Sequence, residues 1–257
     1  MSDSKLVSCI MISPNCHHPR NHKIDTITIH HMAGNLTVET CGQLFQRQSR
    51  EASSNYGIGT DGRIGLYVHE EDRAWTSGSP ANDHRAITIE VANDGGQEAN
   101  WHVSEKAMAS LIDLLVDVCR RNGIEKLVWS DSKEDRVNHR NGCNMTVHRD
   151  FQATACPGPY LYSKQGWIAE QVNKRLEEKA PTEYDKFKSF MAQYKAEVAA
   201  KPVEEFAEKA VDVCKSLGIM VGDPDGSFRA QDGVERQELA CVAAALIKMI
   251  NETKDAL

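Results

Sequence analysis

A histidine and a cysteine on one short segment are the residues of this chain best suited to chemistry. His148 lies eight residues before Cys156, and Pro157-Gly158 follows directly. Far upstream, the pair His30-His31 ends a segment rich in isoleucine and threonine. Two imidazoles and one thiolate are three protein ligands for tetrahedral zinc, and they leave a fourth position for water. Zinc lowers the pKa of that water to about 7, so the pattern indicates a zinc hydrolase.

The two upstream histidines cannot easily serve the same metal ion. Residues 24–30 alternate apolar and β-branched side chains, as a strand entering a core does. Successive side chains of a strand point to opposite faces of its sheet, so His30 and His31 diverge. One of them therefore binds the metal, and the other neighbours the site or packs in the core.

The elements that must position these residues alternate between strand and helix. Thr37 begins a helical pattern that runs to residue 50, and Ser104 begins a longer one that stops at Asn122-Gly123. Asp61-Gly62 predicts a hairpin turn. Strand patterns cover residues 24–30, 56–60, 63–68, 86–91 and 126–129. Strands interleaved with helices predict an α/β domain built on a mixed β-sheet flanked by helices.

Four of these segments, taken together, resemble the zinc-dependent N-acetylmuramoyl-L-alanine amidases of the phage-lysozyme and peptidoglycan-recognition-protein type. Residues 27–33 resemble the strand with the first zinc ligand, and residues 55–64 the strand and turn with a catalytic tyrosine. Residues 86–91 resemble the strand with an active-site glutamate, and residues 146–158 the loop with the last two ligands. The resemblance covers about residues 20–176, in the family's order. It implies the family's fold, zinc as cofactor and peptidoglycan as substrate.

The resemblance also implies which side chains hold the metal. His30, His148 and Cys156 stand at the positions of the three ligands. His31 is then the packed or neighbouring histidine, and packing is our expectation. A cysteine that ligates zinc is not available as a nucleophile.

Three further residues complete the site that the resemblance implies. Glu90 lies among apolar strand residues, where a carboxylate without a task is costly, so we expect it to accept a proton or orient water. Tyr56 stands at the family's tyrosine, whose hydroxyl lies near the attacking water or the developing oxyanion. Thr154 stands where the phage lysozyme has lysine and the animal recognition proteins have threonine. Its hydroxyl can donate to an oxyanion but brings no positive charge.

Two loop residues are candidates for substrate binding. Trp75 follows the predicted hairpin, and Asn93 follows the strand that carries Glu90. Loops at the ends of neighbouring strands often line a groove, where an aromatic face can stack on a sugar or a peptide. We therefore expect both to contact substrate.

Composition excludes some classes of function. A net charge of −7 gives no reason to expect nucleic acid as a partner. The eight cysteines show neither a paired zinc spacing nor the density of a disulfide scaffold. The first residues lack the basic and apolar runs of a signal peptide, and no stretch has the roughly 18 apolar residues of a membrane span. We expect synthesis in a host cytoplasm, no membrane partner, and action at the cell wall after release.

The last third of the chain predicts a small all-α domain. Lys, Glu and Ala dominate residues 177–202, a predicted helical linker, and helical patterns follow at residues 207–217 and 235–249. With the loop Gly222–Arg229 between them, these helices resemble one S-layer homology motif, which in that family binds cell-wall polymers. Ala230 and Glu235 depart from the motif, and a helical pair that joins two chains is the alternative. Phe228 excludes an EF-hand, since that loop needs glycine there.

We therefore expect an amidase domain at residues 1–176, the linker, and a wall-binding or oligomerisation module at residues 203–257. The expected activity is hydrolysis of the bond between N-acetylmuramic acid and L-alanine, as in a phage or prophage endolysin. Two other functions stay open. One is a protein that recognises peptidoglycan without cleaving it, and the other is a cysteine peptidase built on Cys156 and His148.

Overall fold

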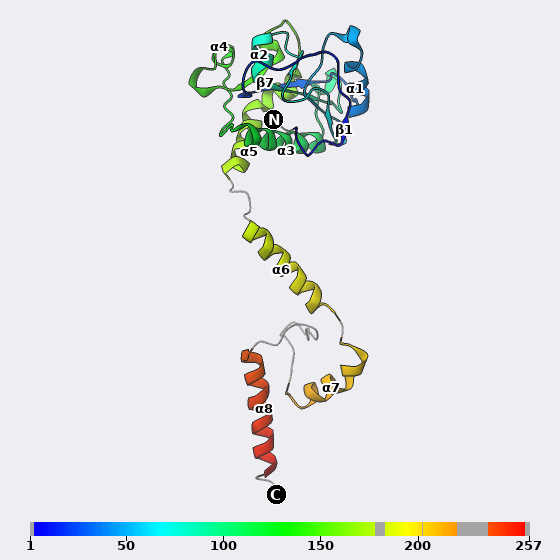
Figure 1. Ribbon diagram of the computed structural model, residues 1–257, viewed down its shortest axis with the longest axis vertical. Coiled ribbons are helices and arrows are strands. Elements are labelled where there is room, and N and C mark those ends of the chain that lie inside the picture. Colours follow the sequence, from blue (N-terminus) through cyan, green and yellow to red (C-terminus); the bar gives the residue numbers. More distant parts are fainter. Residues whose placement is uncertain (1–2, 178–182, 202, 220–235, 255–257) are drawn as a thin grey trace. The chain divides into compact units, whose positions relative to one another are not determined.

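The computed structural model describes residues 3–177, 183–201, 203–219 and 236–254 (Figure 1). The chain divides into two compact units, Met1–Glu178 and Lys179–Leu257. Among the helices in these described ranges, none combines the length and the apolar character that crossing a membrane requires.

A mixed sheet of six strands forms the centre of the first unit, in the order β1-β5-β4-β7-β3-β8. Strands β4 and β5 are antiparallel, as the Asp61-Gly62 turn predicts, whereas β1–β5, β4–β7, β7–β3 and β3–β8 are parallel pairs. The strands are β1 (Cys9–Ile10), β3 (Thr26–His31), β4 (Tyr56–Ile58), β5 (Ile64–Leu66), β7 (Ala86–Val91) and β8 (Met145–Val147). A separate antiparallel pair consists of β2 (Cys16–His17) and β6 (Arg73–Ala74).

The two faces of the sheet have different roles. Ile29 and Ile89 are fully buried in a core that also contains residues of α3 (Glu105–Asn122) and α5 (Gly158–Glu177). These two helices lie side by side in Figure 1. The opposite face is covered in part by α1 (Val38–Phe45). Because strand side chains alternate, the residue after each isoleucine faces the α1 side.

The helix ends follow from the local sequence. The Thr37 hydroxyl accepts a hydrogen bond from the backbone N–H of Thr40, and the Ser104 hydroxyl accepts one from Ala107, so both predicted N-caps are confirmed. Helix α3 ends at Gly123, whose φ of 67° is left-handed and suits glycine. Helix α1 is shorter than predicted and is followed by a 3-10 turn, η1 (Gln48–Arg50).

The prediction of a strand at residues 126–129 is wrong. This segment has no strand pairing, and its backbone groups are bonded largely by asparagine side chains. The amide of Asn173 both accepts from the N–H of Leu127 and donates to its carbonyl, and Asn144 accepts from the N–H of Val128. Side chains thus supply the bonds that a neighbouring strand would have made.

Short helices connect the larger elements. They are α2 (Pro80–Arg85), α4 (Lys133–Val137), η2 (Gln97–Ala99), η3 (Arg140–Gly142) and η4 (His148–Asp150). The last of these begins directly after β8 and carries one of the predicted metal ligands.

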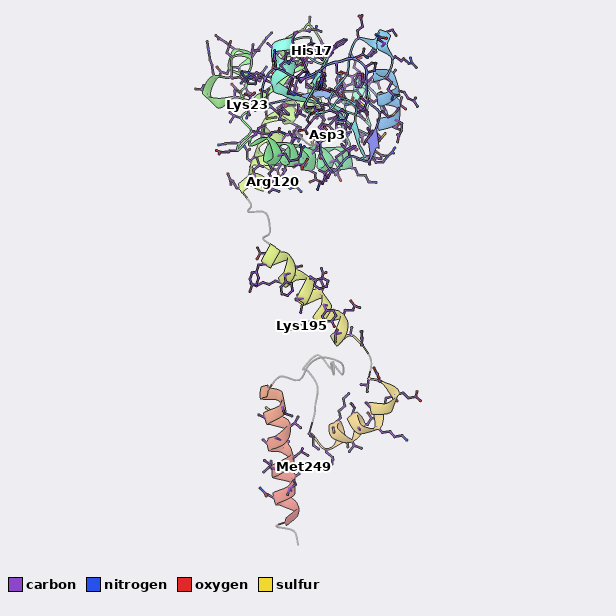
Figure 2. All side chains as sticks on the ribbon, in the orientation of Figure 1. Asp3, His17, Lys23, Arg120, Lys195 and Met249 are labelled. Carbon is purple, nitrogen blue, oxygen red and sulfur yellow. The ribbon has the colours of Figure 1, made fainter. Side chains whose placement is uncertain are left out.

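The second unit contains α6 (Glu183–Ala199), α7 (Glu205–Ser216) and α8 (Arg236–Lys254), in agreement with the predicted helices (Figure 1). Figure 2 draws the side chains along α6, with Lys195 labelled. Large apolar side chains are exposed on α6 and on α8, for example Phe187 and Ile247. The loop Gly222–Arg229 and the positions Ala230 and Glu235 lie outside the described residues.

Candidate metal centre

His30 and Glu90 reach the same place because β3 and β7 are parallel and in register. His30 pairs with Glu90 in the sheet, and their side chains leave the face opposite the isoleucine core. The Nδ1 atom of His30 lies 4.0 Å from Oε1 of Glu90. The side chain of His30 is 1% exposed and that of Glu90 15% exposed, so both groups are largely removed from water.

His148 is brought to this point by β8, which pairs with β3 on the side away from β7. A buried ion pair fixes the turn that follows β8. The Asp150 carboxylate accepts from the Val147 N–H at 3.1 Å and from both Nε and Nη2 of Arg136 at 2.9 and 2.5 Å. Arg136 is 2% exposed, so this clamp is protected from solvent.

The three predicted ligands converge. One donor atom from each of His30, His148 and Cys156 lies within 4.8 Å of the other two. The Cys156 sulfur is 3.5 Å from Nδ1 of His30, and the rings of His30 and His148 are 4.9 Å apart between centroids. Nε2 of His30 is buried without a hydrogen-bond partner among the described residues. Two nitrogens and a sulfur arranged this way are the donor set of a zinc site with an open position.

Burial dominates the protonation of the cluster. Burial, together with His148, holds the pKa of His30 well below its ordinary value, so the ring is neutral and able to bind a cation. Burial also raises the pKa of Glu90 to about 8, against a smaller lowering by Arg50. Burial raises the pKa of the Cys156 thiol as well, followed by the nearby charge of Glu90.

The raised pKa of Cys156 argues against a cysteine peptidase. A nucleophilic cysteine needs a thiolate near neutral pH, and an adjacent imidazolium or a helix N-terminus usually provides it by lowering the pKa. Cys156 is 7% exposed, and its neighbour His30 is held neutral. A metal cation is the partner that would turn this buried thiol into a thiolate.

A cleft of about 280 Å³ opens beside the cluster. Its lining includes His148 and Cys156, together with Glu90 and Thr154. The other side is mainly apolar and includes Met32, Leu36, Leu44 and Phe45. A second hollow of about 280 Å³ shares Ala52, Trp75, Thr76 and His148 with the first. The space available to a substrate therefore extends to both sides of His148.

Three of the predicted catalytic and substrate residues lie in this space. Glu90 and Thr154 line the cleft, and Trp75 lines both hollows. The Thr154 hydroxyl accepts a hydrogen bond from the Cys156 N–H at 3.2 Å, which leaves its own O–H able to donate.

Tyr56 does not reach the cluster. Its register partner in β7 is Ile89, so its side chain enters the core on the face opposite Glu90. Its hydroxyl donates to Oε1 of Glu70 at 2.7 Å and accepts from the N–H of Ser4 at 3.0 Å. This placement is incompatible with the predicted contact to an oxyanion, and Tyr56 serves instead to satisfy a buried carboxylate.

Asn93 also departs from its predicted role. It is 1% exposed, and the described residues that line the cleft do not include it. Its Nδ2 donates to the carbonyl of Trp101 at 2.8 Å, so the side chain is directed toward the following loop and away from substrate. The predicted substrate contact is therefore incompatible with its burial.

Two residues of the cleft carried no motif in the sequence. Arg50 lines the cleft and is the cation that lowers the pKa of Glu90. His31 is 9% exposed, lines the same cleft, and meets the edge of Trp101 at 5.2 Å between ring centroids. The expectation of a packed His31 is confirmed, but the sequence offered no signal for Arg50, because it follows a helix and belongs to no repeat or spacing.

Comparison with known families gives two matches. Residues 20–159 match the family described as N-acetylmuramoyl-L-alanine amidase. Residues 200–240 match the family described as S-layer homology domain. Comparison with curated protein sequences finds no match.

Solved structures with a similar fold include three amidase or endolysin domains. The endolysin amidase LysCS from Clostridium intestinale is 18% identical, with a TM-score of 0.45, over 65% of this chain and 97% of that one. The catalytic domain of XlyA is 16% identical, with a TM-score of 0.47, over 64% and 97%. A selenomethionine derivative of AmpD is 16% identical, with a TM-score of 0.47, over 66% and 99%.

Proposed function

The chain belongs to the N-acetylmuramoyl-L-alanine amidase family, and from that premise we propose that it cleaves the bond between N-acetylmuramic acid and L-alanine with zinc held by His30, His148 and Cys156. The observation that carries the proposal is the convergence of these three donor atoms within 4.8 Å at the edge of a cleft. The unpartnered Nε2 of His30 and the neutral ring fit a bound cation. Zinc bound there would supply Lewis acidity, which polarises the amide carbonyl and lowers the pKa of a water molecule to about 7.

Glu90 is the proton acceptor in this proposal. Its pKa of about 8 means that the carboxyl group exchanges a proton near neutral pH, as a general base and acid must. Oε2 of Glu90 is buried and has no hydrogen-bond partner among the described residues. Glu90 therefore takes the proton of the attacking water at this carboxylate and delivers it to the leaving amide nitrogen.

Thr154 and Trp75 have supporting roles. The Thr154 hydroxyl, whose oxygen already accepts from the Cys156 N–H, donates its own proton to the oxyanion that develops on the carbonyl. Trp75 lines both hollows beside His148 and places an aromatic wall along the substrate. Tyr56 and Asn93 have no place in this mechanism.

For the whole chain, we propose the role of a phage or prophage endolysin that reaches the wall after synthesis in a host cytoplasm. The S-layer homology match at residues 200–240 supports anchoring on a secondary cell-wall polymer. The apolar side chains exposed on α8, such as Leu239, Leu246 and Ile250, support a second arrangement in which these helices join copies of the chain. The organisation proposed is an amidase domain at residues 1–176, a helical linker, and this module at residues 203–257.

The decisive experiment incubates the purified protein with bacterial peptidoglycan and identifies the released fragments by mass spectrometry. Stem peptides with a free L-alanine amino terminus, lost with a chelator and restored by zinc, are the expected result. Stems that stay joined to muramic acid while the protein binds the wall would instead establish a recognition protein.

A further inference from the structure

The loop after β7 has a backbone that other parts of the fold must hold in place. Asn100 and Trp101 have φ values of 54° and 58°, in the left-handed region that residues with a side chain rarely adopt. Two consecutive residues of this kind persist where surrounding contacts over-determine them, and such places are often functional.

Three hydrogen bonds hold this loop. Nδ2 of Asn93, just beyond β7, donates to the Trp101 carbonyl at 2.8 Å, and the Trp101 N–H donates to the Gly96 carbonyl at 2.9 Å. The N–H of Tyr160, in the first turn of α5, donates to the Asn100 carbonyl at 3.1 Å. The loop is therefore tied both to the strand that carries Glu90 and to the helix that follows Cys156.

The Trp101 side chain lies against the turn that carries the metal-binding thiol. A Cβ atom at Gly158 would lie 3.0 Å from Cβ of Trp101 and 3.3 Å from Nδ1 of His31. Gly158 has a φ of 78°, so the position requires glycine for its backbone as well as for its space. The indole edge also meets the His31 ring at 80° between planes.

His31 continues the contact toward the sulfur. Its backbone donates a hydrogen bond to Cys156, which lowers the pKa of that thiol against the larger effect of burial. Neither Nδ1 of His31 nor Oδ1 of Asn93 has a hydrogen-bond partner of good geometry among the described residues, yet Asn93 is close enough to raise the pKa of His31 against the larger, lowering effect of burial. Asn93, Trp101 and His31 thus form one packed unit behind the Cys156 turn.

We propose that Trp101 is a positioning residue of the metal centre, held by Asn93, and that it keeps the Cys156 sulfur within ligand distance of His30 by packing on Gly158 and His31. This inference rests on the proposed zinc site. Residues that orient metal ligands without touching the ion typically change metal affinity 10- to 100-fold when altered. None of the three donor side chains is changed by altering Trp101.

The test measures the metal and not the reaction. Zinc affinity is measured by competition with a chromophoric chelator, and sulfur ligation by the thiolate-to-cobalt charge-transfer absorption of the Co²⁺-loaded protein. Trp101→Ala should weaken zinc binding about 10- to 100-fold and reduce the charge-transfer band. Trp101→Phe, which keeps a ring on Gly158, should restore most of both.

Two further variants protect the interpretation. Trp167→Ala removes a 41% exposed tryptophan of α5 and should leave both readings unchanged. Asn93→Ala removes the bond to the Trp101 carbonyl while the indole stays, and it should shift both readings in the same direction as Trp101→Ala, even if the latter folds poorly. Folded Trp101→Ala and Asn93→Ala proteins with unaltered zinc affinity and an unaltered band would overturn the proposal. Peptidoglycan left uncleaved by a protein whose metal readings behave as expected would overturn the amidase function alone.

Discussion

The Cys156 sulfur lies 3.5 Å from Nδ1 of His30, although 126 residues separate the two in the chain. The contact exists because β8 pairs with β3 and delivers the segment from His148 onward beside the end of that strand. At this distance both atoms can ligate one ion, and the burial of both keeps water from competing for them. Most of the predictions below follow from this meeting point.

Replacing the thiol should remove the metal. Cys156→Ala leaves two imidazoles, which cannot retain zinc against a chelator, and cleavage of peptidoglycan should fall to background with the zinc content. Metal analysis after dialysis and the release of stem peptides are the two measurements. Cys143→Ala is the matched control, because Cys143 is equally buried but bonds the carbonyl of Val128. An active Cys156→Ala protein without zinc would rule the mechanism out.

Removing the carboxylate should slow the reaction while the metal stays. Glu90→Gln keeps the size of the side chain but cannot accept a proton, so kcat should fall by about 10²- to 10⁴-fold. Zinc content should stay near one ion per chain, since Glu90 is not one of the three donors. Glu39→Gln, at an exposed glutamate of α1, should behave like the unaltered protein. A Glu90→Gln enzyme with unchanged kcat would assign the proton transfer to another group.

The same carboxylate makes the metal-free protein sensitive to pH. The folded pKa of about 8 lies above the ordinary value of 4.5, so between these two pH values the folded state holds a proton that the unfolded state has released. The free energy of unfolding of the chelated protein should therefore fall as pH rises through this window, by an amount on the order of a few kcal/mol. Urea unfolding at several pH values measures it, and Glu90→Gln should flatten the slope. Equal slopes for both proteins would contradict the assignment.

Tyr56 should matter for stability and not for catalysis. Tyr56→Phe leaves the buried N–H of Ser4 without its partner and takes one donor from Glu70, which should cost about 1–3 kcal/mol of unfolding free energy. Turnover at a temperature where the variant is folded should equal that of the unaltered protein. A normal unfolding free energy combined with a large loss of kcat would place this hydroxyl in the reaction after all.

A shortened chain that ends at Glu177 should separate cleavage from anchoring. It keeps all of α5, including the buried Val172 and the Asn173 side chain that bonds Leu127, so the first unit should stay folded. We expect unchanged cleavage of soluble muramyl peptides and weaker pelleting with intact walls. Equal pelleting of the short and full chains would favour an assembly role for the second unit.

Much of the first unit could be predicted because the relevant signals are local. The hydroxyls of Thr37 and Ser104 cap the helices that follow them, and the Asp61-Gly62 turn joins two antiparallel strands. Both depend on residues adjacent in the chain. The failed strand at residues 126–129 is the counterexample, since its apolar pattern suits a strand but its bonding partners are side chains of Asn144 and Asn173.

The sequence by itself determined the chemistry of the site, because histidine, histidine and cysteine are a zinc donor set wherever they meet, and the alternation of β3 and β7 separates His30 and Glu90 from the isoleucine core. Only the tertiary structure decided which other residues join them. Tyr56 pairs with Ile89 and not with Glu90, and a shift of one residue in that register would have moved it to the other face. Register between strands, like the approach of Arg50 and Trp101 to the cleft and its ligand turn, depends on the packing of the whole sheet, which no local pattern contains.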